Sequence, residues 1–337
     1  MKNENSSNEP PFRVSDSKEI LKNPYRLIIA NEARRRGIGV ELVDAENGCF
    51  ALDFGGLRII FCGSLSELTT AIAVRRCDDK ALTRRLLRRT GLQVPDQCRF
   101  ETLEQAEAFL SKHHRIVVKP ARGEEGAGIS VDVRKPEELA PTIEFARRVC
   151  ETVLLEKFCG GEDLRIVVID FKVVAAVVRR PARIIGTGRD SIAELIRIQS
   201  RRRRVATGGE SSIPLDEETE RCVRMGDYAM DDVLAEGEVL VVRKTANVHT
   251  GGTIHDVTPE LHPVLVEVAC TAARVIDIPV MGLDLLVPDA AGSDYVIIEA
   301  NEQPGLANHE PQPTAERFVD LLFPQTADPQ PFTGSHS

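Results

Sequence analysis

The sequence predicts a mixed α/β (α+β) protein in which two α+β subdomains follow a small α/β unit. Three observations favour this fold class. Apolar, β-branched runs of strand length recur along most of the chain. Between them lie segments that begin at helix-capping residues and end at glycine or a turn. Finally, a length of 337 residues is enough for two or three subdomains, each with its own core.

The composition is that of a soluble globular protein, with 42% hydrophobic and 28% charged residues. The net charge of −9 argues against a nucleic-acid partner, which would need a basic surface. No run approaches the roughly 18 apolar residues of a membrane span, and the polar start of the chain is unlike a signal peptide. The eight cysteines, including Cys49 and Cys62, lack metal-site spacing, so we expect reduced core thiols in a cytoplasmic protein.

The first part of the chain is divided into a flexible tail, residues 1–22, and an N-terminal α/β unit, residues 23–90. Within the unit we expect, in order, a helix over 24–36, a strand over 38–44, strands over 50–54 and 57–61, and helices over 64–77 and 80–90. Gly55-Gly56 is a strong signal for a two-residue hairpin turn. Ser64 and Glu67 have the spacing of a capping box, which predicts the start of a helix.

The second unit, residues 91–158, is expected to be a β-rich α+β module that acts as a lid. Its expected elements are a strand ending near 100, a helix over 102–112, a strand–turn–strand motif over 115–133, a helix over 136–150 and a strand over 152–158. Thr102 and Gln105 cap the first of these helices, and Pro136 opens the second.

The third unit, residues 159–324, is expected to be the catalytic subdomain, followed by a flexible tail over 325–337. We expect its strands over 164–170, 172–180, 239–244, 280–288 and 296–301. Thr258-Pro259 predicts the start of a long helix that ends near Ile276. A short helix is also expected over 226–237.

Two adjacent strands near the end of the chain each carry a carboxylate where a core residue is expected. Asp284 interrupts VMGLDLLVP, and Glu299 and Asn301 lie on one face of the strand VIIEAN because side chains alternate. We expect the strands to pair antiparallel across the turn PDAAGS. Buried carboxylates need a counter-ion, and an all-oxygen set suits Mg²⁺ or Mn²⁺ better than Zn²⁺. The alternative is a pair of strand ends that face solvent.

Lys119 ends a β-branched run, and Pro120 keeps it extended before the turn GEEGAGIS. The glycines of this turn allow backbone N–H groups to approach phosphate oxygens closely. The loop is not a Walker motif, because Ile129-Ser130 stands where Lys-Ser/Thr belongs. It joins two strands, so it predicts a flap over phosphates, with a plain glycine-rich hairpin as the alternative.

The motifs KP-x₂-G-x₂-G-x-GI, LEKFCGGEDLR, GLDLL and IIEANEQPGL, in this order, resemble the ATP-grasp superfamily of carboxylate–amine ligases. Segments 178–196 and 242–258 are similar to the ATP-grasp part of cyanophycin synthetase and of bifunctional glutathione synthetases. The N-terminal half is most similar to N-acetylglutaminylglutamine synthetase. The resemblance covers about residues 25–323. We expect neither the additional acetyltransferase-like domain of the dipeptide synthetase nor the second ligase domain of cyanophycin synthetase in this sequence.

The resemblance implies an ATP-grasp fold, with two α+β subdomains clasping ATP, and a role for each site residue. Lys80 and Lys119 would hold ATP phosphates under a flap that contains Gly126, Ala127 and Gly128. The segment Glu156, Lys157 and Phe158 would hold adenine through its backbone, and Asp163 matches the position that binds ribose. The implied magnesium ligands are Asp284, Glu299 and Asn301. Arg165, Arg179 and the segment Asn247 to Gly252, with Gly251 and Gly252, would face the γ-phosphate and the acyl substrate.

We therefore expect an ADP-forming ligase that uses ATP and Mg²⁺ (or Mn²⁺) to join amino-acid or acyl-amino-acid substrates through an acyl phosphate. N-acetylglutamine joining glutamine is the first choice. A cyanophycin-like or glutathione-like peptide ligase, a small-molecule kinase on the same fold and a non-catalytic nucleotide-binding module are the alternatives. No nucleic-acid or membrane partner is expected, and a homo-oligomer is left open.

Several arginines remain to be placed. Arg179 leaves an apolar strand, so we expect it to meet the acyl phosphate, with a surface salt bridge as the alternative. The run Arg201 to Arg204 is either a solvated loop or an attractor for an anionic substrate. The helix before this run is expected to begin at Ser191, after a glycine turn.

Overall fold

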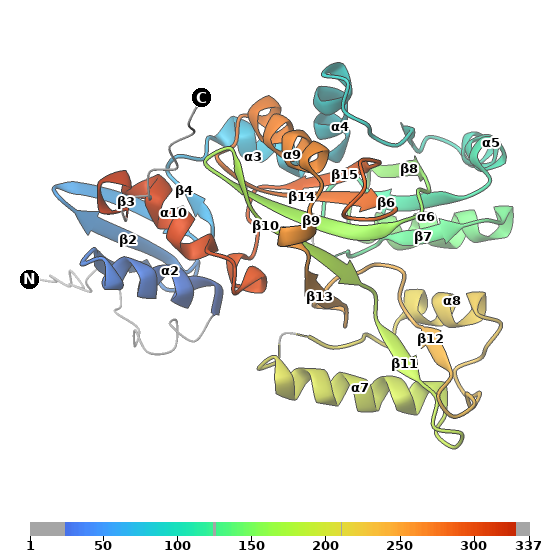
Figure 1. The fold of residues 1–337 in the computed structure, drawn as a ribbon. Helices are drawn as coiled ribbons and strands as arrows, with labels where there is room; N and C mark the ends of the chain where they lie inside the picture. Colours follow the sequence, from blue (N-terminus) through green and yellow to red (C-terminus); the bar gives the residue numbers. More distant parts are fainter. Residues whose placement is uncertain (1–23, 124–125, 210, 328–337) are drawn as a thin grey trace, which may run out of the picture. The chain divides into compact units, whose positions relative to one another are not determined.

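The fold is described from a computed structural model, which describes residues 24–123, 126–209 and 211–327. The chain forms two compact units, one comprising the chain up to Leu68 and from Gly305 onward, the other Thr69–Pro304. These boundaries differ from those expected near residues 90 and 324, because the two helices before residue 90 pack within the second unit. Figure 1 shows the elements of both units.

The first unit is an antiparallel sheet covered by helices. Its strands, in sheet order, are β1 (Gly39–Asp44), β2 (Cys49–Phe54), β3 (Leu57–Cys62) and β4 (Leu65–Ser66). Its helices are α2 (Pro24–Arg35) and α10 (Thr314–Leu322), with short 3₁₀ turns η3 (Leu306–His309) and η4 (Pro324–Thr326). The core contains Phe50, Phe61 and Phe318, whose neighbouring ring centroids lie 5.7 and 6.0 Å apart. The predicted hairpin at Gly55-Gly56 is confirmed, with φ of 61° and 82° at the two glycines.

The helix expected to begin at Ser64 is wrong. The chain there continues as the short strand β4, and the Glu67 carboxylate accepts a hydrogen bond from the Ile60 N–H on β3. The helix α3 (Ala71–Asp78) begins later, where the Thr70 hydroxyl accepts a hydrogen bond from the Ala73 N–H.

The expectation of eight reduced thiols is also wrong, because Cys49 and Cys62 form a disulfide. The two residues are direct partners on the antiparallel strands β2 and β3, with Cα atoms 4.2 Å apart. Directly opposite residues on antiparallel strands have Cα atoms about 4.5–5.5 Å apart, which is within the usual range for a disulfide. The free cysteines are Cys77, Cys98, Cys150, Cys159, Cys222 and Cys270.

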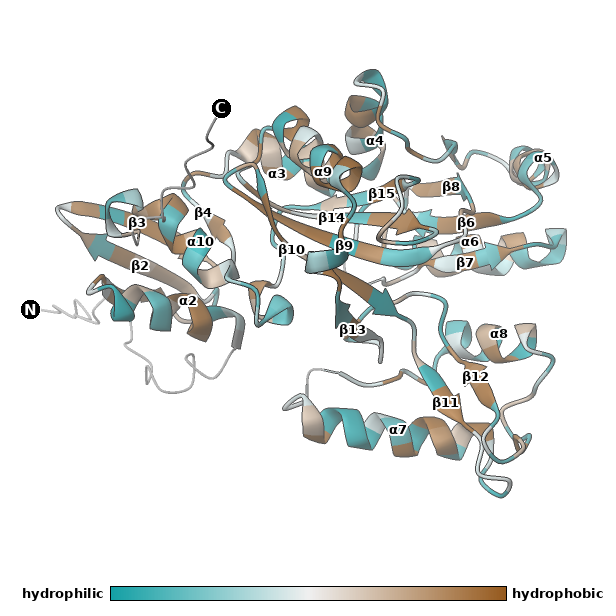
Figure 2. Ribbon diagram, in the orientation of Figure 1, coloured by the Kyte–Doolittle hydropathy of each residue, from teal (hydrophilic) through white to brown (hydrophobic). Residues whose placement is uncertain are grey.

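The second unit is built around a five-stranded antiparallel sheet. Its strands, in sheet order, are β13 (Thr253–Asp256), β10 (Lys172–Arg180), β9 (Glu162–Ile169), β14 (Val280–Val287) and β15 (Val296–Asn301). The helices α3, α4 (Lys80–Arg89) and α9 (Pro263–Ile276) pack on one face through residues such as Leu164 and Ile166 of β9. Because side chains alternate, Asp163 and Arg165 of β9 point to the opposite face. Hydrophobic colour along β9 and β10 gives way to hydrophilic colour toward the end of β10 (Figure 2).

A second antiparallel sheet in this unit corresponds to the expected lid. Its strands, in order, are β5 (Gln97–Arg99), β8 (Val153–Lys157), β6 (Ile116–Pro120) and β7 (Ser130–Val133). They share a core with α5 (Leu103–His113) and α6 (Leu139–Arg147), which follows the 3₁₀ turn η1 (Pro136–Glu138). The predicted strand–turn–strand motif over 115–133 is confirmed as β6 and β7.

A smaller α/β layer is inserted between β10 and β13. It contains the ribbon β11 (Arg183–Ile185) and β12 (Val239–Val241), with α7 (Ile192–Ala206) and α8 (Glu217–Met225), around its own apolar cluster. The short helix expected over 226–237 is wrong, because the helix of this region ends at Met225 and turns follow it. The arginine run 201–204 lies in α7 rather than in a loop.

The long helix expected from Thr258 begins later than predicted. Thr258–Glu260 forms the 3₁₀ turn η2, and α9 starts at Pro263 with His262 as its N-cap. Within the described part of the chain, no helix has the length and apolar character needed to cross a membrane.

Candidate active site

A network of two acids and two arginines lies on the face of the five-stranded sheet opposite α3, α4 and α9. Asp284 of β14 is the register partner of Arg165 on β9. Arg165 binds both carboxylate oxygens of Asp284, with Nε at 2.7 Å and Nη2 at 2.8 Å. Arg179 of β10 reaches the same carboxylate, with Nη2 3.0 Å from Oδ2. Its Nη2 also lies 2.6 Å from Oδ1 of Asp163, so the four side chains are continuous.

The two acids of this network differ in protonation behaviour. Burial alone would raise the pKa of Asp284, but Arg165 and Arg179 outweigh burial and hold that pKa below its usual range. For Asp163, burial raises the pKa and Arg179 offsets only part of that effect. Burial would lower the Arg179 pKa, yet the two acids raise it. Asp284 is therefore an anion that two guanidinium groups neutralise.

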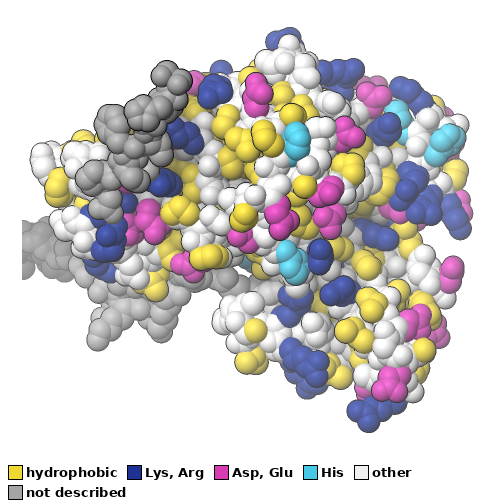
Figure 3. Space-filling view, viewed as in Figure 1, with side chains coloured by type: hydrophobic (Ala, Val, Ile, Leu, Met, Phe, Trp, Pro, Cys, Tyr) yellow, Lys and Arg dark blue, Asp and Glu magenta, His cyan; other side chains and the backbone are white. Residues whose placement is uncertain are grey.

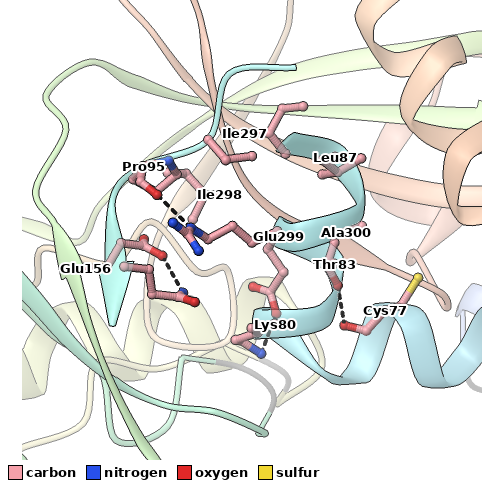
Figure 4. A pocket seen from close by; sticks show the side chains of 13 residues that line it. Cys77, Lys80, Thr83, Leu87, Pro95, Glu156, Ile297, Ile298, Glu299 and Ala300 are labelled. Carbon is pink, nitrogen blue, oxygen red and sulfur yellow. Dashed lines mark hydrogen bonds and ion pairs between the residues drawn. The ribbon is translucent and has the colours of Figure 1, made fainter. Parts of the chain in front are cut away.

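Glu299 extends the network on the neighbouring strand. It is the register partner of Asp284 across β14 and β15, so the predicted antiparallel pairing is confirmed. Lys80, at the start of α4, is 8% exposed and places Nζ 2.6 Å from Oε1 of Glu299. Lys80 also donates to the carbonyl of Gly123, at 3.1 Å, where the flap begins. The two side chains point toward one another in Figure 4.

Lys119 forms a second ion pair, in the lid sheet. Its Nζ lies 2.8 Å from Oε2 of Glu156, and both residues are 3% exposed. Gln97 of β5 donates its amide to the same carboxylate at 2.9 Å. The predicted strand position of Lys119 is thus confirmed, while the Glu156 side chain is engaged with the lysine.

Glu156, Lys80 and Glu299 line one pocket, together with Thr83, Arg84, Pro95, Gln97 and Ile298, among others. Sequence reasoning missed Arg84 and Gln97. Arg84 donates Nε to the carbonyl of Pro95 at 2.9 Å. Burial lowers the pKa of Arg84. Arg84 could not be singled out from the sequence, because KALTRRLLRRT carries four arginines and nothing in the pattern distinguishes the one that lines the pocket.

The expected flap lies between β6 and β7, and the structure describes part of it. Gly126 and Gly128 both have positive φ, at 74° and 69°, which explains the need for glycine. A Cβ on Gly128 would lie 3.2 Å from Cα of Ala146 on α6, so this glycine also permits close packing. Ala127, between the two glycines, belongs to the same turn.

The segment from Glu156 to Phe158, which is expected to hold adenine, already uses some of its backbone groups within the second unit. The N–H groups of Lys157 and Phe158 donate to the carbonyls of Asp96 and Arg115. The Arg115 guanidinium also lies over the Phe158 ring, 3.9 Å from its centroid. Any adenine contact at Phe158 is therefore left to its carbonyl rather than its N–H.

The segment from Asn247 to Gly252 forms a tight turn. The Asn247 side chain accepts a hydrogen bond from the His249 N–H, and its carbonyl accepts one from the Gly252 N–H. A Cβ on Gly251 would lie 2.5 Å from Ile213, and one on Gly252 would lie 3.0 Å from the carbonyl of Arg180. The glycines are thus explained by packing, and the turn lies against the end of β10, one residue beyond Arg179.

The donor set around Asp284 fits a hard divalent cation. Asp284 and Glu299 supply carboxylate oxygens from adjacent strands, and the Asn301 amide nitrogen lies 3.4 Å from Oδ2 of Asp284. Turning that amide would direct its oxygen to the same place. Groups of three His, Cys, Asp or Glu suited to a metal are absent from the described residues, so the set depends on Asn301 as its third member. Such an oxygen set suits Mg²⁺ and not Zn²⁺.

Several known proteins are similar to this chain in sequence or in fold. A family model described as a RimK-like ATP-grasp domain matches residues 77–206. The cyanophycin synthetase of Trichormus variabilis is 31% identical over 330 residues, covering 92% of this chain and 36% of that protein. The glutathione biosynthesis bifunctional protein of Mannheimia succiniciproducens is 27% identical over 293 residues, covering 82% and 39%. The crystal structure of a bifunctional glutathione synthetase from Pasteurella multocida matches with a TM-score of 0.60 at 23% identity, covering 89% and 43%.

The family match identifies residues 77–206 as a RimK-like ATP-grasp domain, and the curated relatives are similar to this chain over most of its length. The two sheets of the second unit are the two α+β parts of the ATP-grasp fold, as predicted. The chain spans 36% to 39% of the length of these two curated relatives.

Proposed function

We propose that the chain is an ATP-dependent, ADP-forming ligase that joins a carboxylate to the amine of an amino acid. One observation carries this proposal. Lys80, Glu299 and Glu156, the partner of Lys119, line a single pocket, and the Asp284 network adjoins it through Glu299. Phosphoryl transfer needs positioning and charge neutralisation more than protein covalent chemistry, and this pocket brings together cations and metal-binding acids.

In the proposed reaction the substrate carboxylate attacks the γ-phosphorus of ATP, ADP leaves, and an acyl phosphate forms. The amine then attacks the acyl carbon, inorganic phosphate leaves with the bonding electrons, and the amine loses a proton. Closure of the flap around Gly126 would keep water from the acyl phosphate. Bound Mg²⁺ would neutralise phosphate charge during the transfer.

Each site residue has a role in this proposal. Lys80 and Lys119 bind phosphate oxygens, and the flap residues Gly126, Ala127 and Gly128 cover them. The hinge Glu156, Lys157 and Phe158 holds adenine, with Asp163 near the ribose. The metal ligands are Asp284, Glu299 and Asn301. The reacting groups are faced by Arg165, Arg179, Asn247, Gly251 and Gly252.

The pairing of Arg179 supports its proposed role at the acyl phosphate. It is buried between Asp163 and Asp284, with a side chain 14% exposed, so the alternative of a surface salt bridge does not describe it. When Mg²⁺ takes over the charge of Asp284, a guanidinium group beside it can turn to an anionic substrate.

For the substrates we propose small amino-acid derivatives, with N-acetylglutamine and glutamine as the first pair. The relatives named cyanophycin synthetase and glutathione biosynthesis bifunctional protein support, as the alternative, a cyanophycin-like or glutathione-like peptide ligase. The cytoplasmic location and the oligomeric state stay predictions.

The test is a screen for ADP release over acyl-amino acids combined with amines, at saturating ATP and Mg²⁺. A ligase releases ADP only when both substrates are present, and the product contains a new amide detectable by mass spectrometry. ADP release without an amine would indicate a kinase, and nucleotide binding without turnover for any pair would indicate a non-catalytic module.

A further inference from the structure

Arg203 differs from the three arginines beside it in α7. Arg201, Arg202 and Arg204 are exposed, whereas Arg203 is half-buried. It shares the inner helix face with Ile196 and Ser200, which precede it by seven and three residues. Basic side chains gather over the lower part of the view in Figure 3, where α7 lies in Figure 1. Within the arginine run, Arg203 is therefore the one that points inward.

The Arg203 guanidinium is only partly satisfied. Its Nη1 donates to the carbonyl of Gly252 at 3.1 Å. Its Nε is buried and has no hydrogen-bond partner, and no described carboxylate forms an ion pair with it. Burial lowers the pKa of Arg203, with no acid to offset it. A buried donor and charge without a partner costs free energy, which is expected where a ligand completes the site.

Two further buried donors lie on the segment from Arg243 to Gly252, which Arg203 contacts at Gly252. Nε of Arg243 and the hydroxyl of Thr245 have no hydrogen-bond partner among the described residues. The Thr245 side chain lies 3.8 Å from the position that a Cβ on Gly126 would take, so the segment meets the flap. Its other end, at Gly252, packs on the carbonyl of Arg180, next to Arg179. The segment from Arg243 to Gly252 therefore carries unpaired donors and runs from the flap to the network around Asp284.

Other arginines near this segment already have acidic partners. Arg165 and Arg179 bind Asp284. Arg180 lies 3.6 Å from Glu162, and Nη1 of Arg243 lies 2.5 Å from Asp216. Of these arginines, Arg203 is thus the one that has no carboxylate partner among the described residues.

The proposed reaction leaves one carboxylate unconsumed. The acyl donor loses its charge when it becomes an acyl phosphate and then an amide, but the amino acid that attacks keeps its α-carboxylate. This anion must be held while the amine is directed at the acyl carbon, and arginine suits a carboxylate through its forked donors. We propose that Arg203 binds the unreacted carboxylate of the amine substrate. This inference rests on the proposed ligase function and assigns the amine subsite within it.

The first experiment measures binding rather than turnover. Calorimetry on the full chain, with Mg²⁺ and a non-hydrolysable ATP analogue present, compares glycine and the nineteen standard L-amino acids with their α-carboxamides. We expect at least one free amino acid to bind roughly 10-fold or more tighter than its carboxamide, because each lost charge-assisted hydrogen bond is worth about that factor. Arg203→Met should remove this preference, and Arg203→Lys should retain part of it.

Arg202→Met is the matched control, because it removes the same charge from the same helix at an exposed position. It should leave the carboxylate preference unchanged. In turnover, Arg203→Met should raise KM for the amine with little change in KM for ATP. A purely structural anchor of Gly252 would instead alter both substrates and the melting temperature together.

The assignment is overturned if no amino acid binds, if wild-type protein binds acids and carboxamides equally, or if Arg203→Met keeps the preference. Should Arg203→Met fail to fold, the wild-type comparison and Arg203→Lys still decide. Failure of the ligase proposal shows separately as absence of ADP release for every acid and amine pair, whereas the carboxylate preference is read from binding alone.

Discussion

At the level of single residues, Asp284 is a buried acid whose partners keep it charged, which its proposed role as a metal ligand requires. Its side chain is 9% exposed and yet ionised, because Arg165 and Arg179 hold its pKa low. Two guanidinium groups balance the two acids of the network, so the charge is compensated before any ligand arrives. A divalent ion would compete with the arginines for Asp284, and any arginine it displaces becomes available to phosphate or carboxylate.

Glu299→Gln tests the metal set, because it removes one negative charge while keeping the size of the side chain. We expect turnover to fall by two or more orders of magnitude, since charge compensation at the phosphates is the main catalytic term. Binding of Mn²⁺, followed by electron paramagnetic resonance in the presence of nucleotide, should weaken in parallel. The fold should persist, because the glutamine oxygen still accepts a hydrogen bond from Lys80.

Asp294→Asn is the control for this substitution, since Asp294 is an exposed acid just before β15. It should leave Mn²⁺ binding and turnover unchanged. Undiminished activity of Glu299→Gln, or full wild-type activity after the metal has been chelated, would contradict the metal assignment.

Lys119→Met tests the phosphate site, but its effect on stability must be separated from its effect on binding. The lysine and Glu156 are both buried, and removing one partner of such a pair costs about 3–5 kcal/mol because the other charge is left alone. We therefore expect lost ATP affinity together with a clear drop in melting temperature.

The double variant Lys119→Met/Glu156→Gln separates the two effects. It removes both charges, so we expect stability to recover much of the loss while ATP affinity, measured by calorimetry, stays weak. If ATP binds the double variant as tightly as wild type, Lys119 has a structural role only.

Much of this residue-level site could be predicted, because strand alternation alone placed Glu299 and Asn301 together and Asp284 inside a core strand. The side chains that pair with these residues could not be predicted from the sequence. Arg165 contacts Asp284 because β9 pairs with β14, and this pairing brings together two residues that are 119 positions apart in the sequence. Asp163 illustrates the same limit, because resemblance implies ribose binding while the register places it against Arg179.

At the level of elements, one sequence pattern gave two different structures. Ser191 and Glu194 form a true capping box at the start of α7. Ser64 and Glu67 have the same spacing, yet Glu67 accepts the Ile60 N–H on β3 and the chain stays in the sheet. The apolar periodicity after Ser191 continues for four turns, whereas Thr69 and Thr70 follow Glu67 and the helix begins only afterwards. Local motifs thus predict an element only where the following pattern can pack.

Asp132 of β7 is a buried acid that stabilises the sheet of β5 to β8 through its ion pairs. It is 2% exposed, adopts φ of 65°, and pairs with Arg115 at 2.6 Å and Arg134 at 2.8 Å. Burial would raise its pKa, but the two arginines outweigh burial and lower it. The pair therefore stabilises the fold above the unfolded-state pKa of about 3.9, and this contribution is lost as pH falls through the lower folded-state value.

Asp132→Asn should lower the free energy of unfolding by about 1–3 kcal/mol at neutral pH, since asparagine keeps the shape and tolerates positive φ. The difference from wild type, measured by urea unfolding, should shrink as pH falls below about 4. Asp170→Asn is the control, because Asp170 also has positive φ, 53°, but is exposed and pairs with the exposed Lys172. A deficit that stayed constant with pH would show that packing, not charge, explains the effect.

At the level of the whole molecule, every residue assigned to nucleotide, metal or substrate falls between Lys80 and Asn301. All of them therefore belong to the second unit, Thr69–Pro304. The first unit has its own sheet, its own aromatic core and a disulfide. The expected boundary at residue 90 failed because α3 and α4 follow the first sheet in sequence but pack against α9, which depends on contacts about 200 residues apart.

This division predicts which strands should change their rates of amide hydrogen exchange when a ligand binds. Nucleotide with Mg²⁺ should slow amide hydrogen exchange in β6, β8 and β14, because ligand binding to the folded state raises the free energy of local opening there. At 100 times the dissociation constant the gain is about 2.7 kcal/mol, or roughly 100-fold slower exchange for amides that open with the site. The strands β2 and β3 of the first unit should keep their exchange rates, since no assigned ligand contact lies in them. Glu299→Gln, measured with the same nucleotide and Mg²⁺, should show a smaller effect in β14. Protection of β2 and β3 equal to that of the lid strands would mean that the two units respond as one, and that the assignment of the whole site to the second unit is incomplete.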